Sequence, residues 1–234
     1  MKRRDKIKLG LVGFIIIAVG IIVYTVLYRI NKTYDPYEVA QINTFLIQKS
    51  DKEQKTNGEM MDYSAKWPLF WGFITLERDG VTFFSQMNSF FDKKGYNRQL
   101  SGTLSIYAFK YLKCINFDFN TIDSVIIKNC PKLLTISGSK NNLVFVQIEN
   151  CPKLETLYLN QNQLKRLDVT GCPNLKELDV EFCPIEKLDV TDYPNLEKLY
   201  ANFSHIKELI VLETHLWQEW ELDSATMVIV SPIL

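Results

Sequence analysis

Aliphatic residues recur along the second half of the chain in the pattern Leu-x-x-Leu-x-Leu, where any aliphatic residue can fill a fixed position. Ten copies begin at Leu112, Ile122, Leu133, Leu143, Leu154, Leu164, Leu175, Ile185, Leu196 and Ile206. Their spacing alternates between 10 and 11 residues, so the full period is 21 residues. We call the halves that begin at Leu112, Leu133, Leu154, Leu175 and Leu196 the short halves, and the others the long halves. A fixed period of this length indicates stacked repeats.

Each half predicts one short strand whose first, fourth and sixth residues point inward. A weaker half, Ser101 to Tyr111, extends the series backwards with Leu104 and Ile106 in phase. A single coil cannot bury its apolar face alone, so the coils must stack around a shared core. We therefore predict a mainly β solenoid with short parallel strands on two opposite sides. About five coils at ~4.8 Å per strand would be about 25 Å long.

The ninth position of each half falls at the bend that follows the strand. It holds Asn120, Cys130, Asn141, Cys151, Asn162, Cys172, Cys183, Tyr193 and Ser204. We expect asparagine here to hydrogen-bond the turn backbone along the stack, and cysteine to fill the same buried space as a weak donor. A proline follows each of these four cysteines. It should fix φ at the corner and give up an N–H that no ladder needs.

The cysteines allow three interpretations. Zinc needs four converging ligands, whereas 21, 21 and 11 residues separate these thiols and His205 and His215 lie elsewhere. Disulfides suit an extracytoplasmic domain, and cysteines one coil apart would have Cα atoms within bonding range. In-register side chains give a poor torsion for that bond, however, and five cysteines cannot all pair. We expect buried free thiols, and no metal or cofactor.

Four segments resemble a known family. They are LETLYLNQNQL (154–164), LKRLDVTGCPNL (164–175), FWGFITLERDGVTFF (70–84) and QLSGTL (99–104). Together they resemble bacterial leucine-rich-repeat surface proteins of the internalin-like kind, over roughly residues 36–212. The resemblance implies a leucine-rich-repeat solenoid with a small α/β N-terminal cap. It also implies that the sheet of the short halves faces the ligand, although the family binds many unrelated ligands.

Positions three, five and seven of the short halves should face solvent. The candidate binding residues there and at the adjoining eighth position are Tyr158, Asn160, Glu177, Asp179, Glu181, Phe182, Tyr200 and Asn202. Exposed tyrosine with acidic and amide neighbours is a common recognition mixture. Phe119 and Phe203 should rim the same side as Phe182. A sheet face that is merely solvated is the alternative, and the sequence leaves it open.

The long halves predict a less distinctive surface. Asp168 and Asp189 should lie on neighbouring strands, with Arg166 and Lys187 offsetting their repulsion by diagonal pairing. Two carboxylates supply too few oxygens for calcium. On the short halves, Glu177 and Asp179 could suggest a glycosidase, but a flat strand offers no pocket. We find no Ser-His-Asp order or phosphate loop, and predict no enzyme.

The N-terminus predicts a membrane anchor. Residues 9–28 carry no charge and are long enough to span a bilayer of about 30 Å. Residues 1–8, MKRRDKIK, hold five basic residues and one acid. The positive-inside rule then places this basic tail in the cytoplasm and the repeats outside it, in the periplasm or at the cell surface. A cleaved signal peptide ending near Ala18-Val19-Gly20 is the alternative.

The remaining segments complete the predicted domain organisation. Residues 29–66 read as a stalk and a capping helix, with Asp35 as N-cap and Phe45 on the apolar face. Residues 67–111 read as the N-terminal cap with the first weak repeat, including a hairpin around Arg78-Asp79-Gly80 and core positions at Trp67, Phe70 and Trp71. The repeats occupy 112–212. Residues 213–234, with His215, Trp217 and Trp220, read as a C-terminal cap that adds a final strand.

Composition narrows the function. The formal net charge is zero, which argues against nucleic-acid binding because that usually needs a basic face. Two functions remain. The first is a membrane-anchored recognition module that binds a protein or glycan through the repeat face. The alternative is a structural or assembly component of a membrane protein complex with no independent ligand.

Overall fold

The computed structural model describes residues 100–232 throughout, the backbone of residues 74–77 and 80–83, and single positions between 37 and 57. The basic tail, the apolar segment 9–28 and Trp67, Phe70 and Trp71 lie outside these residues, so the roles assigned to them stay predictions. Within the described part of the chain, no helix combines the length and apolarity needed to cross a membrane.

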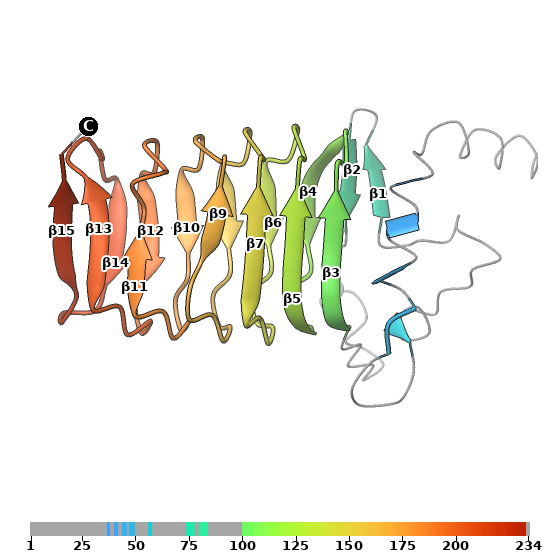
Figure 1. The fold of residues 1–234 in the computed structure, drawn as a ribbon, viewed down its shortest axis with the longest axis horizontal. Helices are drawn as coiled ribbons and strands as arrows, with labels where there is room; N and C mark the ends of the chain where they lie inside the picture. The colour runs from blue at the N-terminus through green and yellow to red at the C-terminus, as the bar shows by residue number, and fades with distance from the viewer. Residues whose placement is uncertain are drawn as a thin grey trace, which may run out of the picture. The chain divides into compact units, whose positions relative to one another are not determined.

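The strands of residues 41–234 lie on two sides of a stack of coils (Figure 1). The first side is one eight-stranded sheet in the order β1 (Ile74–Glu77), β2 (Gly80–Phe83), β4 (Leu112–Asn116), β6 (Thr135–Ser137), β8 (Thr156–Tyr158), β10 (Glu177–Asp179), β12 (Lys198–Ala201) and β14 (Glu219–Leu222). The second side holds a four-stranded sheet of β3 (Ser101–Tyr107), β5 (Thr121–Lys128), β7 (Phe145–Glu149) and β9 (Asp168–Thr170), and a three-stranded sheet of β11 (Lys187–Asp189), β13 (Glu208–Leu212) and β15 (Met227–Ser231).

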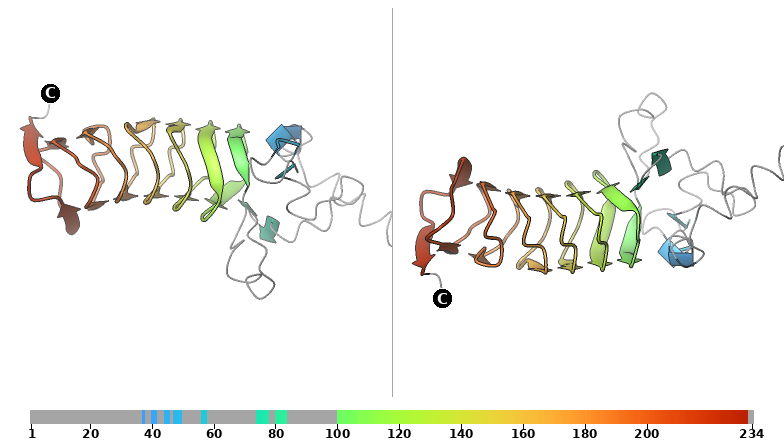
Figure 2. Two further views of the ribbon diagram at one scale, coloured as in Figure 1. Left: turned by 90° about the horizontal axis from the view of Figure 1, so that it is seen from below. Right: turned by 90° about the horizontal axis from the view of Figure 1, so that it is seen from above.

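The core lies between the two sides, as the aliphatic pattern predicts. Parallel pairing places Leu157 of β8 beside Leu178 of β10, which lies beside Leu199 of β12. All three are fully buried, because every coil presents its inward residues to the coils before and after it. Figure 2 shows the two rows of strands with the turns between them. The prediction of a solenoid with parallel strands on two sides is confirmed.

The second side is divided between β9 and β11, which corrects the expectation of one sheet on each side. One coil earlier, the backbone N–H of Gln163 donates to the carbonyl of Leu143 at 2.9 Å. Pro184 occupies the equivalent position in the next coil and has no N–H to give. Pro184 therefore cannot make the corresponding bond. One coil later the equivalent N–H, of His205, donates to Asp223 instead, and β11 and β13 still pair there.

The asparagines at the ninth position tie neighbouring coils together at the corners after the first three short halves. Asn162 donates to the carbonyls of Gly138 at 2.9 Å and Leu159 at 2.8 Å, and it accepts from the N–H of Leu143 at 2.9 Å. Asn141 makes the corresponding bonds one coil earlier. Both side chains are buried, where an unpaired backbone group is costly. The predicted hydrogen bonding along the stack is confirmed.

Three of the cysteines occupy the corner after the long halves. Cys130, Cys151 and Cys172 are buried, and none of the three forms a disulfide. Each Sγ lies 3.5 Å from the carbonyl oxygen two residues earlier in its own coil, which is a weak contact. The N–H of the residue three positions later donates to the carbonyl of each cysteine, forming a turn with proline second. Cys183, also buried, lies instead at an asparagine corner and donates to Leu159 O at 3.2 Å.

The two ends of the repeats differ in how their edges are covered. The predicted hairpin is present, with Glu77 opposite Gly80. At the same end, the side-chain amides of Gln48 and Asn57 make paired hydrogen bonds to the backbone of Thr103 and Ser101 in β3. These amides satisfy backbone groups at the edge of a sheet. The complete capping helix and N-terminal cap stay predictions.

The last described residues add a further coil in the repeat register. Trp220 lies opposite Leu199, and Val230 lies opposite Val211. Both therefore take inward positions, but Trp220 is 43% and Val230 58% exposed. The predicted final strand is present as β15. The pattern Trp-x-x-Trp-x-Leu at 217–222 continues the repeat register with aromatic residues in aliphatic positions. The assignment of residues 213–234 as a C-terminal cap stays a prediction.

Candidate binding face

All eight candidate residues lie on the first side, on β8, β10 and β12 or in the turns after them. Tyr158, Asp179 and Tyr200 face outward because they alternate with inward leucines. Parallel register places Asp179 directly between the two tyrosines. Glu221 on β14 lies next to Tyr200 and extends this row of outward residues by one strand. The sequence numbering thus predicts which residues come together, although their role in binding remains a hypothesis.

Neutral groups bond the carboxylates of this face. The side-chain amide of Asn160 donates to Asp179, and that of Asn202 donates to Glu221 at 2.8 Å. The hydroxyl of Tyr200 donates to Glu219 at 2.7 Å, so none of these donors brings a positive charge to its carboxylate. Such bonds fix the direction of the side chains between neighbouring coils without neutralising them.

Negative charge accumulates toward the C-terminal end of this side. We call the following residues the acidic face: Glu177, Asp179, Glu181, Glu219, Glu221 and Asp223. Lys198 lies within it, at an outward position between Glu177 and Glu219. Among the outward residues of these coils, the six carboxylates therefore outnumber the cationic side chains.

The pKa values of this face follow from burial and crowding. Partial burial raises the pKa of Asp179, and the nearby charges of Glu177 and Glu221 raise it further. Burial likewise raises the pKa of Glu181, with Asp179 and Glu221 adding to the shift. Burial and the neighbouring Glu177 carboxylate raise the pKa of Tyr158 to about 12. A cationic ligand would relieve this repulsion.

Exposed aromatic rings follow the acidic face at the eighth position. Phe119, Phe182 and Phe203 have left-handed backbones with φ of 59°, 55° and 58°, and their side chains are 47%, 48% and 61% exposed. The rings of Phe182 and Phe203 stack with centroids 4.7 Å apart and planes 13° apart. The expectation that these three phenylalanines rim the first side agrees with their exposure.

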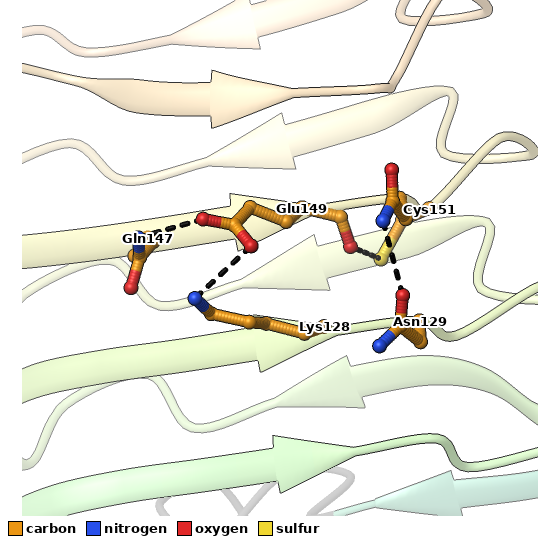
Figure 3. A network of polar contacts seen from close by, with 6 residues as sticks. Lys128, Asn129, Gln147, Glu149 and Cys151 are labelled. Carbon is orange, nitrogen blue, oxygen red and sulfur yellow. Dashed lines mark hydrogen bonds and ion pairs between the residues drawn. The ribbon is translucent and has the colours of Figure 1, made fainter.

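The second side balances its charges differently (Figure 3). Lys128 Nζ on β5 lies 3.0 Å from a carboxylate oxygen of Glu149 on β7, and Gln147 donates to the same carboxylate at 2.7 Å. Lys187 on β11 forms a corresponding pair with Glu208 on β13 at 3.0 Å. On this side, opposite charges meet directly across the strands.

The predicted pairing around Asp168 and Asp189 is wrong. These residues belong to β9 and β11, which lie in separate sheets. Lys187 pairs with Glu208 instead of an aspartate. Asp189 accepts hydrogen bonds from the N–H and hydroxyl of Thr191, two residues later.

Sequence reasoning missed part of the acidic face. Glu219 and Glu221 were assigned to a cap, yet β14 places them beside Lys198 and Tyr200. Trp217 and Trp220 carried the missing signal, since they repeat the first and fourth positions of a half. Phe203 was expected only at the rim, whereas its ring stacks on Phe182.

The described residues offer no cluster of three or more His, Cys, Asp or Glu side chains suited to hold a metal ion. The outward groups of the first side are carboxylates, amides, phenols and phenyl rings. This arrangement suits recognition by charge, hydrogen bonds and aromatic contact.

A family model described as leucine rich repeats (2 copies) matches residues 152–193. The comparisons with curated proteins and with solved structures find no match to the chain. The family match and the solenoid of parallel strands together support a leucine-rich-repeat protein. Solenoids of this class are typically non-enzymatic scaffolds for interactions and generally bind proteins.

Proposed function

We propose that this protein is a membrane-anchored, extracytoplasmic recognition module that binds a protein partner through the acidic face and Tyr158, Asn160, Phe182, Tyr200 and Asn202. The bacterial, internalin-like character inferred from the sequence is part of the same proposal. Its ligand-facing sheet is the one that carries these residues.

One observation carries the proposal. On the strands of the first side, the described side-chain partners of the carboxylates are amides and a phenol, whereas lysine–glutamate pairs cross the strands of the second side. Directly before the strands each side has one such pair, Lys176–Glu155 on the first and Lys207–Glu186 on the second. Charge left uncompensated in the free protein is available to a partner of opposite charge. A charged protein surface fits this face better than a neutral glycan does.

The proposed topology rests on the N-terminal sequence. Residues 1–8 are basic and residues 9–28 are uncharged, so the positive-inside rule supports a cytoplasmic N-terminus. In intact cells, added protease should digest an epitope tag at the C-terminus and spare one at the N-terminus. The opposite pattern would reject the topology and leave the binding face to be tested separately.

The binding face is tested with two matched triple variants of the full chain. The first is Tyr158→Ala, Asp179→Asn and Tyr200→Ala; the control is Gln147→Ala, Asp168→Asn and Asp189→Asn on the second side. Each variant is immobilised, incubated with membrane and surface proteins, and compared with wild type by quantitative mass spectrometry. A specific partner should bind wild type and the control but not the first variant, with thermal unfolding unchanged. Equal loss from both variants, or from neither, contradicts the proposal.

A further inference from the structure

The eighth position carries different residues on the two sides of the solenoid. After the first three long halves it holds Asn129, Asn150 and Gly171, which have positive φ and accept a left-handed backbone readily. After the last two it holds Asp192 and Glu213, without positive φ. After the short halves it holds Phe119, Lys140, Gln161, Phe182 and Phe203, all with positive φ. Phenylalanine is uncommon in this conformation. Its presence here gives the fold no core contact in return, because the rings of Phe182 and Phe203 are half exposed.

The Phe182–Phe203 stack presents aromatic surface to solvent. The rings are nearly parallel and neighbours in successive coils, and the N–H of Phe182 donates to the carbonyl of Asn202 at 3.1 Å. The turn backbone is therefore fixed by the repeat ladder. Exposed aromatic groups on a rigid support are the type of residue that dominates binding energy at protein interfaces.

The eighth position of the short halves also shows which kind of group can lie above such a ring. Lys140 Nζ lies 4.5 Å above the centroid of the Phe119 ring, one coil along the stack. This distance is within the range of a cation–π contact. Among the described residues, such a contact is found at Phe119 but not at Phe182 or Phe203. This position therefore holds one ring with a lysine above it and two stacked rings without one.

The charges around the two stacked rings favour a cation. Glu181 precedes Phe182 in the chain, and Asp223 accepts the N–H of Phe203 at 2.8 Å. The Glu221 carboxylate is held by Asn202, which precedes Phe203. An approaching cation would meet ring faces and carboxylates together. Arginine matches this setting better than lysine, since its guanidinium plane can stack on a ring and bond a carboxylate.

We propose that the Phe182–Phe203 stack, with Glu181 and Glu221 beside it, docks an arginine side chain of the protein partner. This inference rests on the proposed function, because it states the chemistry that the partner brings to the same face. The ring supplies the stacking surface and the carboxylates supply the counter-charge. The partner is accordingly a protein that presents arginine in an accessible segment.

The test uses the full chain in nonionic detergent at low ionic strength, where charge contacts are least screened. The probe is an acetylated and amidated Gly-Ser-Arg-Gly-Ser-Arg-Gly peptide; its twin has citrulline, a neutral isostere, in place of arginine. NMR signals of Phe182 and Phe203 are followed during titration. The arginine peptide should shift them saturably, and the citrulline peptide should not. Equal responses to both peptides would overturn the proposal.

Two variants separate ring contact from charge. Phe182→Leu with Phe203→Leu keeps apolar bulk and should weaken arginine-peptide binding about twofold to fivefold, the range expected for an exposed cation–π contact. Glu181→Gln with Glu221→Gln should weaken it as well. The control, Phe119→Leu, changes a ring that already has a lysine above it and should leave binding unchanged. Unchanged binding by the double leucine variant would also overturn the proposal.

The partner experiment distinguishes this inference from the proposed function. If the triple variant of Tyr158, Asp179 and Tyr200 loses the partner while the double leucine variant keeps it, the binding face stands and the arginine site fails. If both variants lose the partner and unfold like wild type, both stand. If neither loses it, both fail.

Discussion

The two sides of the solenoid are built from nearly interchangeable half repeats, yet their outward surfaces differ in charge balance. On the second side, Lys128–Glu149 and Lys187–Glu208 pairs cross neighbouring strands. On the first side, Asp179 and Glu221 are bonded by asparagine amides, which are neutral donors. Inward residues therefore define the repeat, and outward residues distinguish a self-balanced surface from one suited to a charged partner.

The corners after the short halves and those after the long halves also differ in their hydrogen bonds. After the short halves, Asn162 joins its own coil to the preceding one with two 2.9 Å hydrogen bonds, donated to the Gly138 carbonyl and accepted from the Leu143 N–H. After the long halves, Cys151 contacts the Glu149 carbonyl in its own coil at 3.5 Å, and its thiol also contacts the thiols of Cys130 and Cys172 in the neighbouring coils. Buried amide–backbone bonds thus link the coils at the first corner, and weaker thiol contacts link them at the second.

The largest expected effect separates these corners. Asn162→Ala removes hydrogen bonds from three buried backbone groups and should lower the free energy of unfolding by about 2–4 kcal/mol. Cys151→Ala removes a small buried group with a weak contact and should cost about 1 kcal/mol. Urea unfolding of the full chain measures both. Equal losses would show that the two corners contribute alike and contradict the comparison.

A second test measures how stability against unfolding changes as the pH falls. Burial lowers the pKa of His215, a corner residue whose Nε2 lies 3.0 Å from the Tyr193 carbonyl. The folded state then binds the proton less well than the unfolded state, so its stabilising effect is complete above about pH 6.5 and declines as the pH falls. Thermal unfolding between pH 7.5 and 5 should show this loss, and His215→Asn should reduce it. An identical pH dependence in the variant would contradict the assignment.

On the first side the pH effect has the opposite sign. Because burial and neighbouring acids raise the pKa of Asp179, the folded state favours its protonated form. The associated stability is present below the unfolded pKa of about 3.9 and is lost as the pH rises through the higher folded value. Asp179→Asn should therefore stabilise the protein at pH 7 by less than about 1 kcal/mol and have no effect near pH 3. Destabilisation at pH 7 would show that the carboxylate contributes net stability.

The smallest expected change in the free energy of unfolding concerns an ion pair on the second side. The side chains of Lys187 and Glu208 are 60% and 40% exposed, so Glu208→Gln should change the free energy of unfolding by about 0–0.5 kcal/mol. Moderate salt should remove that difference. Urea unfolding at two salt concentrations measures it. A loss above about 1 kcal/mol would assign this pair a structural role beyond charge balance.

The sequence was informative where one rule acts on every coil. The aliphatic period predicts the strands, the two sides and the inward residues, and the ninth position predicts the buried corner. The same Cys-Pro pair occurs at both kinds of corner, and only at Pro184 does the proline stand where the preceding coil has an N–H that donates across the stack. Which outward side chains bond depends on distances between coils, so the Asn160–Asp179 contact could not be read from the period alone.

The C-terminal region shows a second limit. Aromatic residues at 217 and 220 replace the aliphatic ones that mark other halves, so the repeat pattern alone missed β14. Because Glu219 and Glu221 lie on that strand, the acidic face extended one coil beyond its predicted end. A repeat pattern that accepts aromatic residues at inward positions would have identified both β14 and the extension of the acidic face.

The most direct test of the account compares the two sides by photo-crosslinking. A benzoylphenylalanine is placed at Tyr158 or Tyr200 on the first side, or at Gln147 or Asp189 on the second, in the full chain made by its own cells. The account predicts one discrete crosslinked protein from Tyr158 and Tyr200 and none from Gln147 and Asp189. Crosslinking from the second side alone, or equally from both sides, would contradict the claim that the acidic first side faces the partner.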